Sequence, residues 1–160
     1  MNVEAKDLPT RDEVIALVRE AFAEDIQRPL TTSLRAGNAI DEYRIAPPFD
    51  SELDAPTDAY LEANFWGIAH LDPASWRHYL PRLIEYVCGQ QDANNVGDAL
   101  FSSLRPPDRD PPRFGSLTDE QNEAVIAFLD HFAFTPESPY AAEAQLALEE
   151  LWAPGAIFRR

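Results

Sequence analysis

The sequence predicts a single all-α domain, a bundle of about six helices, and three observations lead to this fold class. Capping boxes at Thr10–Glu13 and Thr118–Gln121 each precede apolar residues at helical spacing. No segment offers a clear partner for a β-strand, and a strand without a partner is not stable. The chain has 160 residues, of which 45% are hydrophobic, so it can bury one core without disulfides or metal.

The first helix is expected over residues 11–27, directly after the Thr10 cap. Its apolar residues form one stripe at helical spacing: Val14, Leu17, Val18, Ala21, Phe22 and Ile26. Pro29 cannot continue a helix and marks its end. Residues 1–9 precede the cap and are expected to be a frayed N-terminus.

Residues 30–56 are rich in turn-forming residues, and Pro47-Pro48 fixes an extended stretch within them. Tyr43 and Ile45 alternate with Arg44, which leaves a short strand as an alternative. Because such a strand has no evident partner, we expect a long ordered loop that lies over the helices.

Two further helical segments are expected before Gly89. Thr57 is the N-cap of the first, whose apolar residues are Tyr60, Leu61, Phe65 and Ile68. Asp72-Pro73 has the pattern of an N-cap followed by proline at the first helical position. Pro81 is expected to end or kink this second segment, and helical spacing then continues to Gly89.

A short helix capped by Asn94 or Asn95 is expected to extend to Leu104. The following residues 105–116 contain four prolines among charged residues, which predicts an exposed, semi-rigid connector. About 45 residues remain after this connector, too few to bury a separate core well. We therefore expect one domain over residues 1–160.

The last two helices follow this connector. Thr118 caps the first, whose core stripe is Val125, Phe128, Leu129 and Phe132. Ser138-Pro139 is expected to start the second, which buries Tyr140, Ala144, Leu148, Leu151 and Trp152. Pro154-Gly155 ends it.

The charge balance restricts the classes of partner. With 13 Lys+Arg against 28 Asp+Glu, the formal net charge is −15, so nucleic acid and anionic membrane surfaces are poor direct partners. No apolar run approaches the ~18 residues of a membrane span, and the N-terminal residues do not resemble a signal peptide. A single cysteine rules out an internal disulfide. These observations suit a cytoplasmic protein.

Two motifs carry a resemblance to a known family. Residues 71–81 contain an aromatic–Tyr–Leu–Pro element around Trp76, and residues 117–121 read Leu-Thr-x-x-Gln at the start of a helix. Over residues 57–131 the chain resembles a family of small uncharacterised bacterial proteins. The resemblance implies a bacterial origin, and it transfers no activity and no functional residue.

Candidate chemical groups are few, and each has an ordinary structural explanation. His70 and Asp72 form an H-x-D pair that a metal could use, but Asp72 is equally explained as a helix cap. Cys88 lies in an apolar stripe, as a buried hydrophobic residue would. The carboxylate pairs are expected on solvated helix faces: Glu20 with Glu24, Asp119-Glu120 and Glu149-Glu150. We expect no catalytic residue, metal or cofactor.

The distribution of acidic residues is the most unusual feature. Residues 114–158 contain no Lys or Arg. The acidic face predicted there comprises Asp119, Glu120, Glu123, Glu143, Glu149 and Glu150. A second stretch without basic residues, 45–75, carries six more acidic residues. Such a field accelerates encounter with a basic partner, although acidity that only maintains solubility explains the same pattern.

We therefore expect an acidic protein-binding module, not an enzyme. Its most concrete form is an immunity protein or inhibitor that docks on and neutralises a basic partner such as a bacterial toxin. The alternative is a small enzyme or ligand-binding protein with a pocket near Trp76, His78 and Tyr79, where aromatic and imidazole groups are adjacent.

Overall fold

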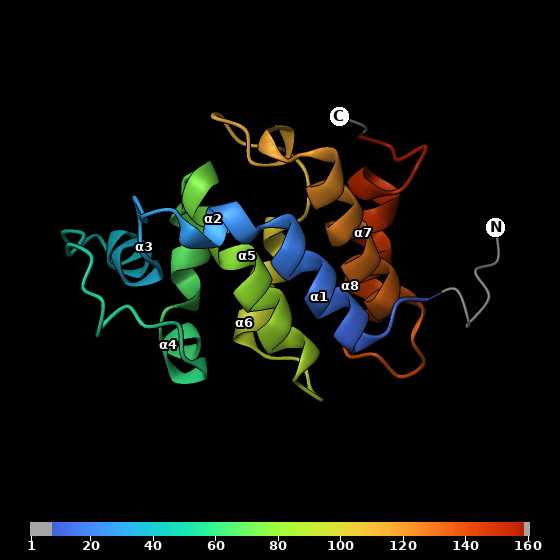
Figure 1. Cartoon of the computed structure of the whole chain (residues 1–160), viewed down its shortest axis with the longest axis horizontal. Helices are drawn as coiled ribbons and strands as arrows, with labels where there is room; N and C mark the ends of the chain where they lie inside the picture. The colour runs from blue at the N-terminus through green and yellow to red at the C-terminus, as the bar shows by residue number, and fades with distance from the viewer. Residues whose placement is uncertain (1–7, 159–160) are drawn as a thin grey trace.

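Helix α5 (Pro73–Cys88) runs through the middle of the molecule, and α1 (Arg11–Ala21), α2 (Ala23–Gln27) and α6 (Asn95–Ser103) pack against it (Figure 1). The computed structural model describes residues 8–158, so the frayed N-terminus expected over residues 1–9 lies largely outside the described residues. The described residues form helices and turns, with no strand. Further α-helices are α3 (Leu34–Asp41), α4 (Asp58–Ala63), α7 (Asp119–Phe134) and α8 (Ala141–Ala147). Shorter helical turns are η2 (Phe65–His70), η3 (Phe114–Ser116) and the π-helical η4 (Leu148–Trp152).

The all-α fold class predicted from the sequence is confirmed, and the local signals that predicted it are in place. Both capping boxes form, at Thr10 and at Thr118, with the threonine side chain accepting from the third residue of its helix. Thr57 and Asn94 cap α4 and α6 in the same way. Asp72 adopts the N-cap backbone conformation of α5, but its side chain does not cap the helix.

The helix expected over residues 11–27 is divided in two at Phe22. This residue has φ −107° and ψ 16°, so its backbone leaves the helical region between α1 and α2. Its side chain is fully buried, which anchors the bend in the core. The bend precedes Asp25, whose buried carboxylate pairs with Arg77 of α5.

The loop expected across residues 30–56 was a wrong prediction for residues 34–41, which form α3. Ser33, interpreted from the sequence as a turn former, is the N-cap of α3 and accepts a hydrogen bond from the amide of Ala36 at 2.9 Å. The rest of the segment, residues 42–56, is an ordered loop as expected. It does not form the alternative strand, because Tyr43 has φ 60° and breaks the extended conformation.

Pro81 neither ends a helix nor starts one. It lies buried inside α5, which continues for seven residues beyond it to Cys88. Proline removes one backbone hydrogen bond from a helix interior. Burial of apolar side chains on both sides of Pro81, such as Leu80 and Leu83, outweighs that loss.

The C-terminal third also differs in detail from the prediction. The last helix begins at Ala141, because Ser138 and Pro139 form a turn before it. In the segment 105–116, residues 105–113 are irregular and the last three form η3, and the expectation of an exposed connector was wrong at Arg113 and Phe114, which are 1% and 2% exposed. None of the helices among residues 8–158 combines the length and apolar character needed to cross a membrane.

Hydrogen bonds shift the titration of three partly or fully buried carboxyl groups, those of Asp54, Asp72 and Asp108. Burial alone would raise the pKa of each group, because it disfavours the charged form. The hydrogen bonds that each carboxylate accepts outweigh burial, so all three pKa values lie below the ordinary value. At Asp130 burial is the dominant effect, and it raises the pKa of the carboxyl group.

Stability is therefore expected to fall in acid. A carboxyl group with a lowered pKa in the folded state stabilises the fold above the unfolded pKa of about 3.9, and this contribution is lost as the pH falls through the folded pKa. Asp130 has the opposite sign and offsets part of the effect. We expect the urea midpoint to be constant from pH 7 to 5 and to drop by pH 3. Asp108→Asn should show a shallower drop than the exposed control Glu149→Gln, and an unchanged midpoint at pH 3 would contradict this account.

Candidate functional site

The most unusual surface is an extension at one end of the molecule, formed by α3, residues 42–56 and η2 (Figure 1). We call residues 34–56 and 65–70 the α3 lobe. Two glycines allow α3 and η2 to touch through their backbones. A Cβ atom on Gly37 would lie 2.6 Å from the carbonyl oxygen of Gly67, and one on Gly67 would lie 2.1 Å from that of Leu34. Only glycine permits this approach.

The loop of the α3 lobe is fixed by the carboxylate of Asp54, whose side chain is fully buried. Arg35 donates to both of its oxygens, with Nε at 3.1 Å and Nη2 at 3.0 Å, and the Tyr60 hydroxyl donates at 2.7 Å. The amide of Asp50 adds a fourth hydrogen bond at 2.9 Å. Arg35 also donates to the carbonyl of Pro48. The loop therefore has one defined conformation although it contains no helix.

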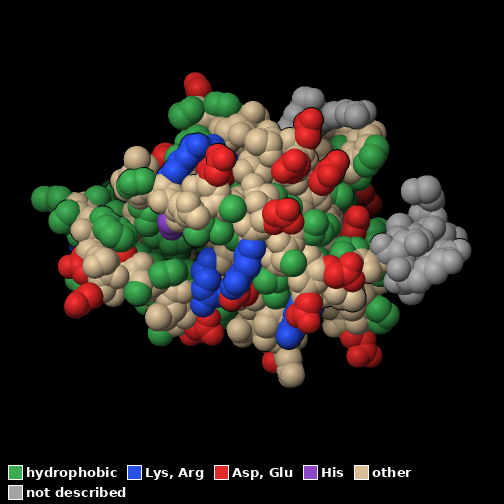
Figure 2. Space-filling view, in the orientation of Figure 1, with side chains coloured by type: hydrophobic (Ala, Val, Ile, Leu, Met, Phe, Trp, Pro, Cys, Tyr) green, Lys and Arg blue, Asp and Glu red, His purple; other side chains and the backbone are tan. Residues whose placement is uncertain are grey.

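This ordered lobe exposes large apolar side chains: Ile40, Tyr43, Ile45, Phe49, Leu53 and Trp66. Tyr43 and Ile45 are 99% and 95% exposed, as they would be in an extended chain. Figure 2 shows hydrophobic side chains gathered at this end of the molecule, next to acidic ones. Exposed apolar patches that are surrounded by charge are typical of protein–protein interaction sites.

The charge of the lobe is mostly negative. The lobe contains five carboxylates and two arginines, of which Arg35 pairs with the buried Asp54. Arg44 pairs with Glu42 at 3.0 Å, and Asp41 accepts from or pairs with His70 at 2.9 Å. Asp50 and Glu52 are also exposed. The apolar side chains are thus surrounded by an acidic rim.

The acidic residues predicted from the sequence lie on α7, α8 and η4, as expected from their positions, and all but one are exposed. Figure 2 shows acidic side chains spread over the α7 half of the molecule. Glu150 is the exception. Its side chain is 15% exposed and accepts from Nε and Nη2 of Arg105 at 2.9 and 2.6 Å. Glu150 is therefore paired with an arginine from outside the stretch 114–158.

The structure brings two of the predicted carboxylate pairs together. Glu20 and Glu24 of the α1–α2 segment line the same surface hollow as Asp119 and Glu120 at the start of α7. Asp25 lies at the base of this hollow and is engaged in a buried ion pair. Among the described residues no His, Cys, Asp or Glu groups are arranged as metal ligands. The hollow offers negative charge for a basic side chain rather than a metal site.

The three residues of the predicted pocket do not lie in one pocket, because one is in the core and two line a surface hollow. Trp76 is fully buried and contacts Phe114 edge-on at 5.8 Å between ring centroids, so it belongs to the core. His78 and Tyr79 do line a surface hollow together with Arg19 and Arg82. The Tyr79 hydroxyl accepts from the amide of Leu34 at 3.2 Å, and His78 Nδ1 lies 3.0 Å from the carbonyl oxygen of Asp25. Both polar groups thus have structural partners.

The remaining candidates have structural roles. His70 contacts Asp41, and Asp72 accepts from the hydroxyl of Thr31 at 2.6 Å. The two residues of the H-x-D pair therefore have different partners and do not act together. Cys88 is buried, and burial raises the pKa of its thiol to about 12. A thiol that stays protonated at neutral pH is a poor nucleophile.

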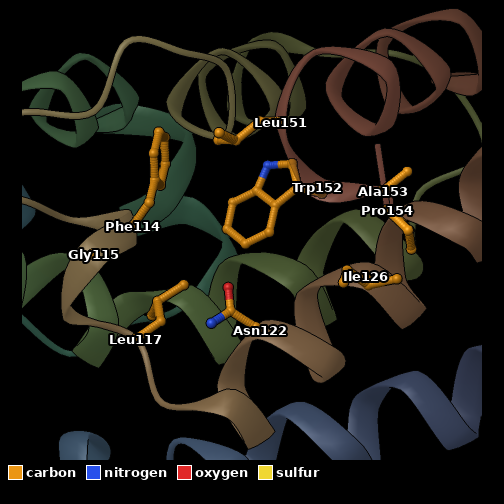
Figure 3. Close-up of a pocket in the computed structure, with 9 residues that line it drawn as sticks. All are labelled: Phe114, Gly115, Leu117, Asn122, Ile126, Leu151, Trp152, Ala153 and Pro154. Carbon is orange, nitrogen blue, oxygen red and sulfur yellow. The ribbon is translucent and has the colours of Figure 1, made fainter. Parts of the chain in front are cut away.

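A further hollow lies between η3, α7 and η4 (Figure 3). Figure 3 shows Trp152 at its centre, with Leu117 and Asn122 on one side and Leu151 above. The Trp152 Nε1 group donates to the carbonyl of Leu104 at 2.7 Å, and Asn122 Nδ2 donates to that of Thr118 at 3.1 Å. No lining residue is titratable, so the hollow is not equipped for acid–base chemistry.

Comparison with known proteins identifies one family. Its model matches residues 10–156, nearly the whole chain, and is described as a family of unknown function (DUF6714). The match extends well beyond the residues 57–131 over which motifs suggested a resemblance. No curated protein and no solved structure matches the chain.

Proposed function

The chain belongs to this family, DUF6714, and we propose that it is a protein-binding domain whose α3 lobe docks on a basic protein partner. The single observation that carries the proposal is the ordered α3 lobe, which exposes Tyr43 and Ile45 on its loop and Trp66 on η2. Its buried Asp54 network fixes the loop in one conformation before binding, which lowers the entropic cost of association.

The exposed side chains have the chemistry of interface anchors. Aromatic residues such as Tyr43 and Trp66 are enriched among the few residues that contribute most of the binding energy. Leaving six large apolar side chains in water is unfavourable for an isolated domain, and covering them in a complex recovers this free energy. The expected interface centre is therefore apolar.

Charge specifies the kind of partner. The net charge is −15, and the lobe has an acidic rim, so a partner with a basic surface is complementary to it. The acidic hollow at Glu20, Glu24, Asp119 and Glu120 and the exposed residues Glu123, Glu143 and Glu149 extend this field over the α7 half. The most concrete form of the proposal is an inhibitor or immunity protein that neutralises a basic protein such as a toxin.

The proposal is tested by selecting a phage-displayed library of random 15-residue peptides on the full chain. We expect the enriched peptides to combine Lys or Arg with aromatic or aliphatic residues. A synthetic copy of the strongest binder is then measured by fluorescence anisotropy. The double variant Ile45→Ser/Trp66→Ser should bind it at least about tenfold more weakly, because both anchors are removed.

Leu17→Ser/Phe134→Ser is the matched control, because it removes two exposed apolar side chains from α1 and α7 instead. It should bind like the wild type, and both double variants should keep the wild-type melting temperature. Selection of acidic peptides, or equal affinity of the two double variants, would refute docking at the α3 lobe. A further variant, Glu143→Lys/Glu149→Lys, should slow association and weaken its salt dependence if the α7 half contributes to steering.

A further inference from the structure

A small polar pocket lies between the end of α6 and the Pro-rich segment, away from the α3 lobe loop. Its lining residues are Ser102, Ser103, Arg105, Pro106, Pro107, Asp108, Arg109, Arg113 and Phe114. Three of the 13 basic residues in the chain therefore meet at one place in a protein of net charge −15. The sequence predicts only a connector for this segment.

Asp108 organises the segment that brings the arginines together. Its Oδ1 accepts from the amides of Arg109, Arg113 and Phe114 at 2.8 to 3.0 Å, and its Oδ2 accepts from that of Gly115 at 2.9 Å. The carboxylate lines the pocket, but these four hydrogen bonds satisfy it. The chain consequently folds back, and Arg113 lies against the α5 side of the pocket.

Arg113 is the central observation. It is 1% exposed, and its Nη2 donates to the carbonyls of Ile68 at 2.8 Å and Leu71 at 2.7 Å. Its Nε and Nη1 are buried and have no hydrogen-bond partner among residues 8–158. The guanidinium carbon lies 5.7 Å from the centre of the Trp76 ring. The carboxylates of Asp108 and Asp72 are its nearest counter-charges, but neither accepts a hydrogen bond from the Nε or Nη1 group.

The other polar groups differ in how far they are engaged. Arg105 is paired with Glu150, and Ser103 accepts from the Trp76 indole and donates to the carbonyl of Leu100. Arg109 is exposed, and one of its groups donates to the carbonyl of Ala69. Arg109 is therefore accessible to an anion from solvent, whereas Arg113 lines the same pocket as a buried charge.

We propose that this pocket binds an oxyanion, namely the phosphate or carboxylate group of a small ligand. The planar guanidinium forks of Arg109 and Arg113 match the oxygen spacing of such groups. An anion would add to the counter-charge of Asp108 and Asp72 and would supply acceptors for guanidinium groups that have none, and a buried donor without an acceptor is unfavourable. The inference does not depend on the proposed protein-binding function, because it concerns different residues.

The test is a ¹H–¹⁵N NMR titration of the full chain with inorganic phosphate, with ionic strength held constant by sodium chloride. We expect saturable shifts below about 10 mM, confined to the amides and arginine Nε groups of residues 102–116. Replacing the buried Arg113 risks the fold, so the decisive variant is Arg109→Gln. Loss of its charged hydrogen bonds should weaken binding about tenfold.

Arg44→Gln is the control, since it removes the same charge from an exposed position on the α3 lobe and should leave phosphate binding unchanged. A parallel titration with sodium acetate distinguishes the two ligand classes: saturation by phosphate alone assigns the pocket to phosphate groups, and saturation by acetate assigns it to carboxylates. Shifts that do not saturate with either anion, or that weaken equally in the two variants, would overturn the proposal.

Discussion

Replacing Asp25 by alanine is expected to lower the free energy of unfolding by about 3–5 kcal/mol, the cost of leaving a buried charge without its partner. The Asp25 carboxylate joins three helices. Its Oδ1 accepts from Nε of Arg77 on α5 at 3.0 Å, and its Oδ2 accepts from Nε2 of Gln121 on α7 at 2.8 Å. Only 8% of the Asp25 side chain and 14% of the Arg77 side chain are exposed, so water cannot replace the lost hydrogen bonds.

The neighbouring residue provides a matched control. Glu24 carries the same charge, but its side chain is 91% exposed and only loosely paired with Arg28, so Glu24→Ala should change stability by less than about 0.5 kcal/mol. Asp25→Asn keeps the shape of the side chain and should fall between the two. Urea denaturation at pH 7 measures all three variants. A loss of stability in Asp25→Ala no larger than in Glu24→Ala would show that the three-helix contact is not held by this carboxylate.

The same residues show why part of the fold could not be predicted. The caps at Thr10, Thr57 and Thr118 act within three or four residues, so the sequence alone identifies them. The partners of Asp25 are 52 and 96 residues away along the chain. Nothing in the local pattern distinguishes this buried carboxylate from the exposed ones beside it.

Prediction of the candidate site was limited in a similar way. The acidic stretches are visible in the sequence because charge is a property of composition. The exposure of the apolar side chains on the α3 lobe is not visible in the sequence, because an isoleucine such as Ile45 or a tryptophan such as Trp66 is equally typical of a core. The exposure of these side chains depends on Asp54, which fixes the loop through Arg35, and on the backbone contact of α3 with η2. The polar pocket could not be predicted because a Pro-rich segment with charged residues also predicts an exposed, semi-rigid connector.

Gly67→Ala is expected to have the second largest effect, and it joins stability to the proposed function. The added Cβ would lie 2.1 Å from the carbonyl oxygen of Leu34 and 2.9 Å from the amide nitrogen of Asn38. Both are backbone atoms of α3, so no side-chain rotation relieves the overlap and α3 must move away from η2. We expect a loss of about 3 kcal/mol in stability, at the upper end of the range for overpacking.

Gly89→Ala is the matched control, because its added Cβ would meet nothing closer than 3.5 Å at the end of α5. If α3 and η2 together position the exposed anchors, Gly67→Ala should also weaken binding of the peptide selected on the wild type. The affinity is measured at a temperature where the variant remains folded. Gly89→Ala should keep wild-type affinity. Wild-type stability of Gly67→Ala would refute the backbone contact itself. If Gly67→Ala loses stability but keeps its affinity for the peptide, the peptide does not dock on the α3 lobe. Moving α3 away from η2 would displace the exposed anchors and would weaken binding there.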